Sequence, residues 1–184
     1  LGRPAVANGG LGYVHTVRAH TQVQSPPHAA YIPTSGGRFR ACSVHDFDII
    51  RVVSGREVAS VYATGANKGA SYFADAGDVD TAAALLTLDD GTLVTLSATR
   101  YNGAGHDVRL EVMGSDGTMG VGFDGSLAVT SAEPGVTFPV GPRHWSFMAR
   151  FLPAARTGLQ RFADVARGPA APTSVLGDAP RGGD

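Results

Sequence analysis

The chain has almost no cysteine, little charge bias and no long apolar run. Cys42 is the only cysteine among 184 residues, which excludes an internal disulfide framework and a cluster of thiolate metal ligands. No apolar run approaches the roughly 20 residues that a membrane-spanning helix requires. We therefore expect a protein of a reducing compartment, placed in the cytoplasm, with no membrane partner.

Net charge and glycine spacing argue against two further partners. The formal net charge is -1 and the pI is about 6.6, so no attraction to nucleic acid is expected. The glycine-dense stretches "NGGLG" at 8–12 and "GTMGVGFDG" at 117–125 lack the G-x-G-x-x-G spacing of a dinucleotide site, and we interpret both as turns. With 43% hydrophobic residues, we expect one globular domain over 1–168 and a loose tail over 169–184.

Hydrophobic periodicity predicts both strands and helices. Residues 13–22 alternate as a strand does, whereas the apolar residues over 38–53 have the spacing of a helix. From residue 58 the period returns to two, with the turn signals "DDG", "SDG" and "DG" between the runs. A last helical run covers residues 145–167, and Pro153 within it is expected, together with Gly158, to break or kink the helix.

These elements predict an α+β fold. We expect an open, predominantly antiparallel β-sheet of roughly five to seven strands with helices packed on one face. The other face of such a sheet needs a cover, and a second copy of the chain is the simplest one. The expected partner is therefore the chain itself, as a dimer or tetramer formed through the exposed sheet face.

Ionisable side chains share one stripe of the first predicted helix, where His45 and Asp48 follow Ala41 at helical spacing. The pair is either a solvated surface pair, or a proton-exchanging imidazole oriented by a carboxylate, or the beginning of a metal site without an evident third ligand. Arg100 ends a predicted strand, and it either lines the rim of a pocket or belongs to the plain surface.

Three segments carry a resemblance to a known family: "VRAHTQVQSPPHAAYIPTSGGRFRACSVHDFDIIRVVSG", "GDVDTAAALLTLDDGTLVTLS" and "HDVRLEVMGSDGTMGVG". Together they resemble the C-terminal domain of the Gfo/Idh/MocA oxidoreductases, and among those the inositol dehydrogenases. The resemblance implies the substrate-binding half of a two-domain enzyme, with an open sheet whose exposed face carries the oligomer interface.

The resemblance also implies roles for particular residues. His45 matches the residue placed next to the reacting carbon, and Asp48 matches a carboxylate that binds a substrate hydroxyl. His20, Gln22 and His106 match substrate-pocket positions more loosely. Ala41 departs from the family, which has an aspartate there that assists proton transfer, and a methyl group neither accepts a hydrogen bond nor carries charge.

Two functions of different class follow. In the first, the chain is an inositol- or sugar-dehydrogenase-like domain that binds a small polyol and oligomerises. It has no cofactor of its own, and NAD enters only if a separate Rossmann chain supplies it, so the domain is not expected to be redox-competent alone. In the second, the chain is a cofactor-independent isomerase, lyase or cyclase with His45 as its acid or base. A structural dimerisation module is the alternative to both.

Overall fold

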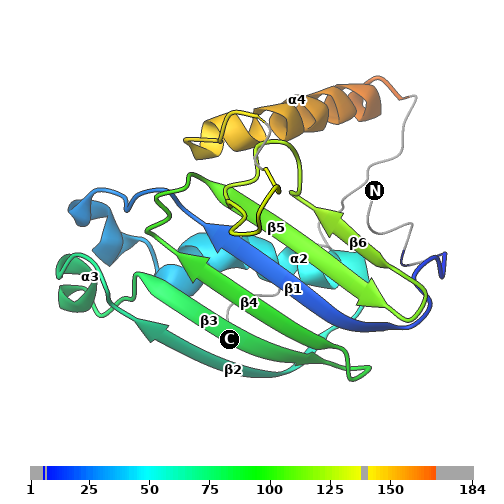
Figure 1. Ribbon diagram of the computed structural model, residues 1–184, viewed down its shortest axis with the longest axis horizontal. Coiled ribbons are helices and arrows are strands. Elements are labelled where there is room, and N and C mark those ends of the chain that lie inside the picture. Colours follow the sequence, from blue (N-terminus) through cyan, green and yellow to red (C-terminus); the bar gives the residue numbers. More distant parts are fainter. Residues whose placement is uncertain (1–5, 7, 138–140, 169–184) are drawn as a thin grey trace.

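A single six-stranded sheet forms the centre of the protein, in the order β2-β3-β4-β1-β5-β6 (Figure 1). The computed structural model describes residue 6, residues 8–137 and residues 141–168. The strands are β1 (Val14–Gln22), β2 (Val58–Ala66), β3 (Thr81–Leu88), β4 (Leu93–Thr99), β5 (Asp107–Gly114) and β6 (Thr118–Val121). β1 runs parallel to β4, and the other neighbouring pairs are antiparallel. The predicted sheet type is confirmed.

The helical elements follow β1, β2 and β6. They are η1 (Ala29–Thr34), η2 (Phe39–Ser43), α2 (Val44–Ser54), α3 (Tyr72–Asp75) and α4 (Phe147–Ala166). The helix predicted over 38–53 is thus two pieces, because η2 is a wider π-helical turn ahead of the regular α2. Gly55 ends α2 with a φ of 67°, a left-handed conformation that glycine adopts without steric cost. No helix in the described ranges is both long and apolar enough to cross a bilayer.

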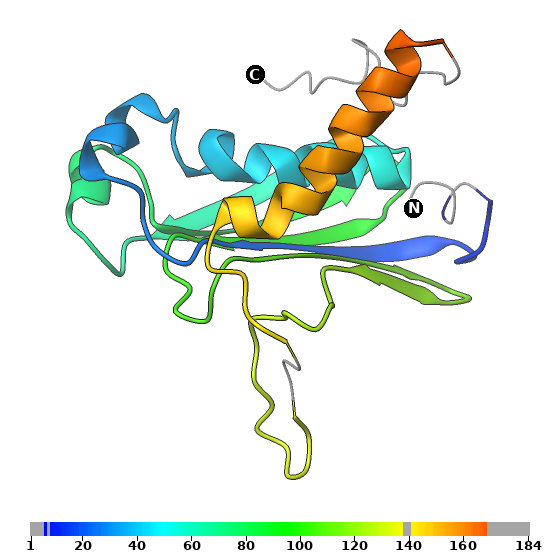
Figure 2. The same ribbon diagram turned by 90° about the horizontal axis from the view of Figure 1, so that it is seen from above.

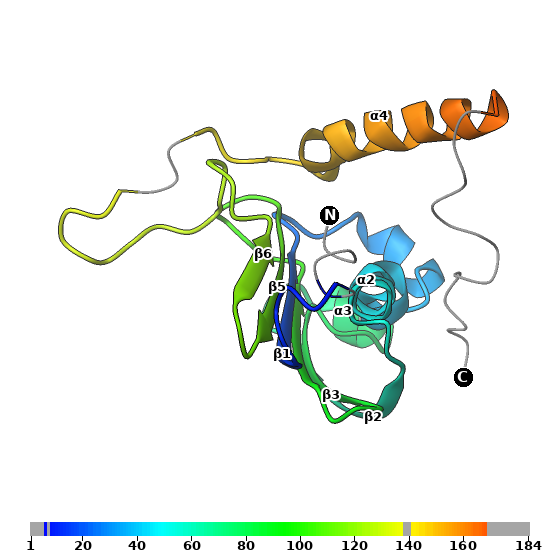
Figure 3. The same ribbon diagram turned by 90° about the vertical axis from the view of Figure 1, so that its right-hand side faces the viewer.

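The side chains of β1 point alternately to the two faces of the sheet, and these faces differ in what covers them. Val17, Ala19 and Thr21 are buried on the face that α2 covers. Because successive side chains of a strand point to opposite faces, Arg18 and His20 point to the other face. Figure 3 shows α2 on one side of the sheet only, and we call the uncovered side the open face.

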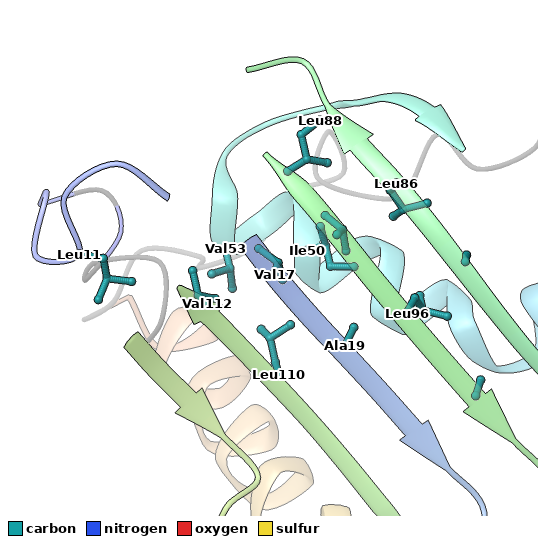
Figure 4. Packing of buried hydrophobic residues seen from close by; sticks show 13 residues of the cluster. Leu11, Val17, Ala19, Ile50, Val53, Leu86, Leu88, Leu96, Leu110 and Val112 are labelled. Atoms are coloured by element: carbon teal, nitrogen blue, oxygen red, sulfur yellow. The ribbon is translucent and has the colours of Figure 1, made fainter. Parts of the chain in front are cut away.

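The core lies between α2 and the sheet. Ile50 is fully buried and Val53 is 7% exposed, and both pack with Val17 of β1 and Leu96 of β4, as Figure 4 shows. The helix contributes its apolar stripe and the strands contribute every second residue, which is the expected packing of one helix on one sheet face.

α4 stands apart from this core, beyond β5 and β6 in Figure 1. It is continuous through Pro153 and Gly158, so the expected break is wrong: a proline removes one backbone hydrogen bond, and a helix of 20 residues keeps its remaining ladder. The part of the chain that follows β6, as far as residue 137, protrudes from the face of the sheet that lies opposite α2 (Figure 2). The predicted tail over 169–184 lies outside the described residues.

Candidate functional site

Two glycines set the direction in which the chain enters η2 and α2. Gly36 and Gly37 have φ values of 80° and 89°, which place both in the left-handed region that favours glycine. The Ser35 hydroxyl accepts a hydrogen bond from the Gly37 amide at 3.2 Å, and the Arg38 amide donates to Asp78 Oδ1 at 2.8 Å. These bonds fix the start of the helical segment that carries the predicted site residues.

Asp46 connects α2 to β1 beneath the helix. Its side chain is 4% exposed, and its Oδ1 accepts a hydrogen bond from the Thr21 hydroxyl at 2.7 Å. Burial raises the pKa of Asp46, while the Thr21 hydrogen bond and the charge of Arg38 oppose that rise. Sequence reasoning missed this residue, although Ser43, Asp46, Ile50 and Val53 have the spacing of a buried stripe.

His45 lies on the outer side of α2. Its side chain is exposed and Asp48 is half-buried, and Asp48 Oδ1 has no hydrogen-bond partner among the described residues. Ala41 belongs to the π-helical turn η2, a feature that is frequent at functional sites. The helix therefore offers an accessible imidazole for proton exchange, with a carboxylate one turn further along.

His20 and Gln22 lie on the open face, so the sheet stands between them and the α2 residues His45 and Asp48. His20 Nδ1 is 3.1 Å from the Ser97 hydroxyl, and the Gln22 amide nitrogen is 3.3 Å from the same ring nitrogen. The register confirms the side, because His20 is paired with Ser97 of β4, whose neighbours Leu96 and Ala98 are buried in the core. The four predicted site residues His20, Gln22, His45 and Asp48 therefore do not converge on one pocket in this structure.

An ion-pair network extends from His20 to β5. Arg109 Nε donates to Asp107 Oδ1 at 3.1 Å, and Arg109 Nη2 forms an ion pair with Asp107 Oδ2 at 2.9 Å and lies 3.0 Å from His20 Nε2. Burial works to raise the pKa of Asp107, but hydrogen bonds and charges from His20 and Arg109 hold it below its usual range. Asp107, Arg109 and Ser97 were not predicted; their alternation along the strands was the available signal.

His20, Ser97 and Arg109 help to line a hollow of about 510 Å³ on the open face. Tyr62, Leu85 and Phe123 line its other parts, and the Arg109 guanidinium lies 5.6 Å from the centre of the Phe123 ring. The lining is largely apolar and includes the charged side chains of Arg18, Arg109 and Glu111. This composition suits a protein side chain or a small ring compound.

The two remaining predicted residues lie elsewhere. Arg100 is 6% exposed, so it does not form a solvent-facing rim, and its charge acts on Arg38, which is 1% exposed beneath η2. His106 is 5% exposed and lies against Phe147 and Phe151 of α4. Among the described residues, neither Arg100 nor His106 contacts His45.

The described residues do not form a dinucleotide site. β1 leads into the proline-containing loop 23–28 rather than into a glycine-rich turn and a helix, which is the arrangement that holds a pyrophosphate. A Cβ added at Gly36 or Gly37 would meet no atom closer than 3.4 Å, so these glycines do not form a close-approach cradle. Among the residues described, no three or more His, Cys, Asp or Glu side chains are grouped as metal ligands.

Comparison with known proteins gives consistent matches. The GFO/IDH/MocA C-terminal domain family matches residues 3–120. The myo-inositol dehydrogenase Hyg17 of Streptomyces leeuwenhoekii is 38% identical over 173 residues, which are 94% of this chain and 51% of that protein. The chain spans about half the length of the curated relatives it matches.

Solved structures agree with the sequence matches. A myo-inositol dehydrogenase from Corynebacterium glutamicum superposes with a TM-score of 0.81 at 27% identity, covering 96% of this chain and 53% of that one. A scyllo-inositol dehydrogenase from Lactobacillus casei, solved with bound NAD(H) and scyllo-inositol, has a TM-score of 0.76 at 27% identity, over 96% of this chain and 53% of that one. The chain therefore belongs to the GFO/IDH/MocA family and comprises its C-terminal domain.

Proposed function

We propose that the chain is the polyol-binding half of an inositol- or sugar-dehydrogenase-like oxidoreductase and does not transfer hydride by itself. The observation that carries the proposal is α2, which presents the accessible His45 and the incompletely paired Asp48 in a domain shared with inositol dehydrogenases. A separate nucleotide-binding half would supply NAD, because the described residues offer no fold that holds it.

The chain's own residues act on the polyol. His45 exchanges a proton with the hydroxyl of the reacting carbon, since an imidazole both donates and accepts near neutral pH. Asp48 accepts a hydrogen bond from a second hydroxyl and so orients the ring. Asp46 stabilises this arrangement by fixing α2 to Thr21, and its role is positioning. His20 and Gln22 lie on the open face, so we assign them no contact with a polyol held at His45 and Asp48.

A second function is favoured by Ala41. The aspartate that the family resemblance implies at this position is replaced by a methyl group, which removes one proton-transfer group from the expected set. A stand-alone, cofactor-independent acid–base enzyme with His45 as its only proton-transfer group is the corresponding alternative. Its reaction would be an isomerisation, an elimination or a ring closure.

Isothermal titration with NAD(H), myo-inositol and scyllo-inositol tests these proposals. We expect heat from an inositol and none from NAD(H) in the isolated chain. Binding of NAD(H) would contradict the assignment of the cofactor to a separate half. Silence toward both inositols in a folded sample would refute polyol binding and favour the cofactor-independent alternative.

We propose further that the open face pairs with a second copy of the chain. Tyr62, Leu85 and Leu93 are 70%, 56% and 57% exposed there, and exposed apolar side chains of this size favour burial in an interface. An ion pair between Arg18 and Glu111 at 3.6 Å lies beside them. An apolar centre with a charged rim is the usual anatomy of such a contact.

Leu85→Glu is expected to convert the oligomer to a monomer, because it places a charge at the centre of the proposed interface. Light scattering reads the mass directly. Val61→Glu is the matched control: Val61 is 60% exposed but is paired with the buried Leu86 and so lies on the α2 side. An unchanged mass for Leu85→Glu, or an equal loss of mass in both variants, would contradict the interface.

A further inference from the structure

α4 is attached to the sheet domain through its first two turns. The rings of Phe147 and Phe151 lie 6.0 and 5.9 Å from the His106 ring, at steep angles of 90° and 80°. Between them, Arg150 donates to the Val108 carbonyl at 3.1 Å and to Asp124 at 2.8 Å. No side chain of α4 is fully buried, and Leu159 and Phe162 in its later turns are 71% and 73% exposed.

His106 is the centre of this attachment. Its side chain is 5% exposed, and its buried Nε2 has no hydrogen-bond partner among the described residues. Its backbone amide donates to the His144 carbonyl at 2.6 Å, which holds the segment leading into α4. The packing thus suits a neutral imidazole, which behaves here as an apolar ring.

The groups that face His106 come from three places. Arg150 of α4 brings positive charge, Asp107, the neighbour of His106 in the chain, brings negative charge, and the segment before α4 brings the His144 imidazole. Asp107 is already paired with Arg109. Asp124 is paired with Arg150 and lies 3.9 Å from His144. A proton on His106 would therefore add a buried charge to a cluster whose carboxylates are occupied.

We propose that His106 is a proton-operated latch: the neutral ring holds α4 against the sheet, and its protonation releases the first turns of α4 while the sheet stays folded. Local opening of an element with few buried contacts is the expected response to such a charge. The device is independent of the reaction that the domain serves. It sets the orientation of a helix whose later turns expose apolar side chains.

The direction of the pH response follows from the closed state. Burial, and next the Arg150 charge, lower the pKa of His106, so the closed form binds the proton more weakly than the open form. The latch is closed at pH values above the ordinary histidine pKa of about 6.5 and opens as the pH falls below it. Each pKa unit between the closed and the open form of His106 allows about a tenfold change in the equilibrium between these forms.

Hydrogen exchange of α4, compared with that of β4 in the same sample, tests the latch. After correction for the intrinsic pH dependence of exchange, we expect opening of residues 147–152 to increase about fivefold or more between pH 7.5 and 5.5, with β4 unchanged. His106→Phe keeps an apolar ring that binds no proton and should abolish the increase. His144→Gln, which removes only the neighbouring imidazole, should retain most of it.

A second measurement does not depend on the variants. In a histidine NMR titration of the unmodified chain, the midpoint of His106 should lie below the ordinary value and coincide with the change in the α4 amide signals. An increase in exchange that persists in His106→Phe overturns the proposal. An ordinary His106 midpoint, or α4 signals that do not follow it, also overturns it.

Discussion

Replacing His45 with alanine is expected to slow turnover by about 10²- to 10⁴-fold, the usual contribution of a positioned proton-transfer group. The same loss is expected whether the chain works with a nucleotide-binding half or alone, because both proposals assign the proton transfer to His45. With NAD the readout is NADH formation by the combined halves, and without it the readout is conversion of the substrate by the chain.

His15→Ala is the matched control for this prediction. His15 is exposed at the beginning of β1. The hydrogen bond between Thr21 and Asp46 places the start of α2 at the other end of that strand. Removing the His15 imidazole should therefore leave turnover unchanged. Ala41→Asp restores the aspartate implied by the resemblance, but it should not create NAD-dependent activity in the isolated chain. Full turnover by His45→Ala would remove this residue from the mechanism.

Asp107→Asn is expected to lower the free energy of unfolding by about 3 kcal/mol at pH 7, because it breaks a buried ion pair and leaves Arg109 without its carboxylate. Asp107 is 4% exposed, accepts a hydrogen bond from Arg109 Nε at 3.1 Å and forms an ion pair with Arg109 Nη2 at 2.9 Å. Urea unfolding at pH 7 measures the difference, and the same titration at pH 3 gives its pH dependence.

The sign of that dependence is set by the lowered pKa of Asp107. The folded state binds the proton less tightly than the unfolded state, so the stabilisation is complete above the unfolded pKa of about 3.9 and is lost as the pH falls through the folded value. The difference between the two proteins should therefore shrink at pH 3. Asp75→Asn, at an exposed position, should stay within about 0.5 kcal/mol of the unmodified chain at both pH values. An Asp107→Asn deficit that is the same at both would contradict the assignment.

Much of the fold was predictable because its signals are local. The alternation in β1 and the helical spacing in α2 are read from neighbouring residues, and the glycine that ends α2, Gly55, directly follows the last residue of that helix. The bulge between Val14 and Thr16 was not predictable, because it depends on the register with β5. The π-helical turn η2 was missed because an apolar spacing does not distinguish it from a regular turn.

The candidate site was less predictable, for reasons of geometry and charge. The alternation that buries Val17 and Ala19 already placed His20 on the opposite face, so the separation from His45 was readable from the strand. The burial of Arg38 and Arg100 was not, since charged residues are mostly exposed. The position of His106 depends on α4, which meets it from more than 40 residues away.

The parallel pairing of β1 with β4 bears on how the chain folds during synthesis. β1 lies inside the sheet, yet its partners are distant: His20 contacts Ser97 and Arg109, 77 and 89 positions later. β1 is therefore paired on both sides only after β5 has been synthesised, and contacts of such separation slow folding. Until then, one edge of β1 has unpaired backbone groups, and an exposed strand edge of this kind is a site that a chaperone would recognise.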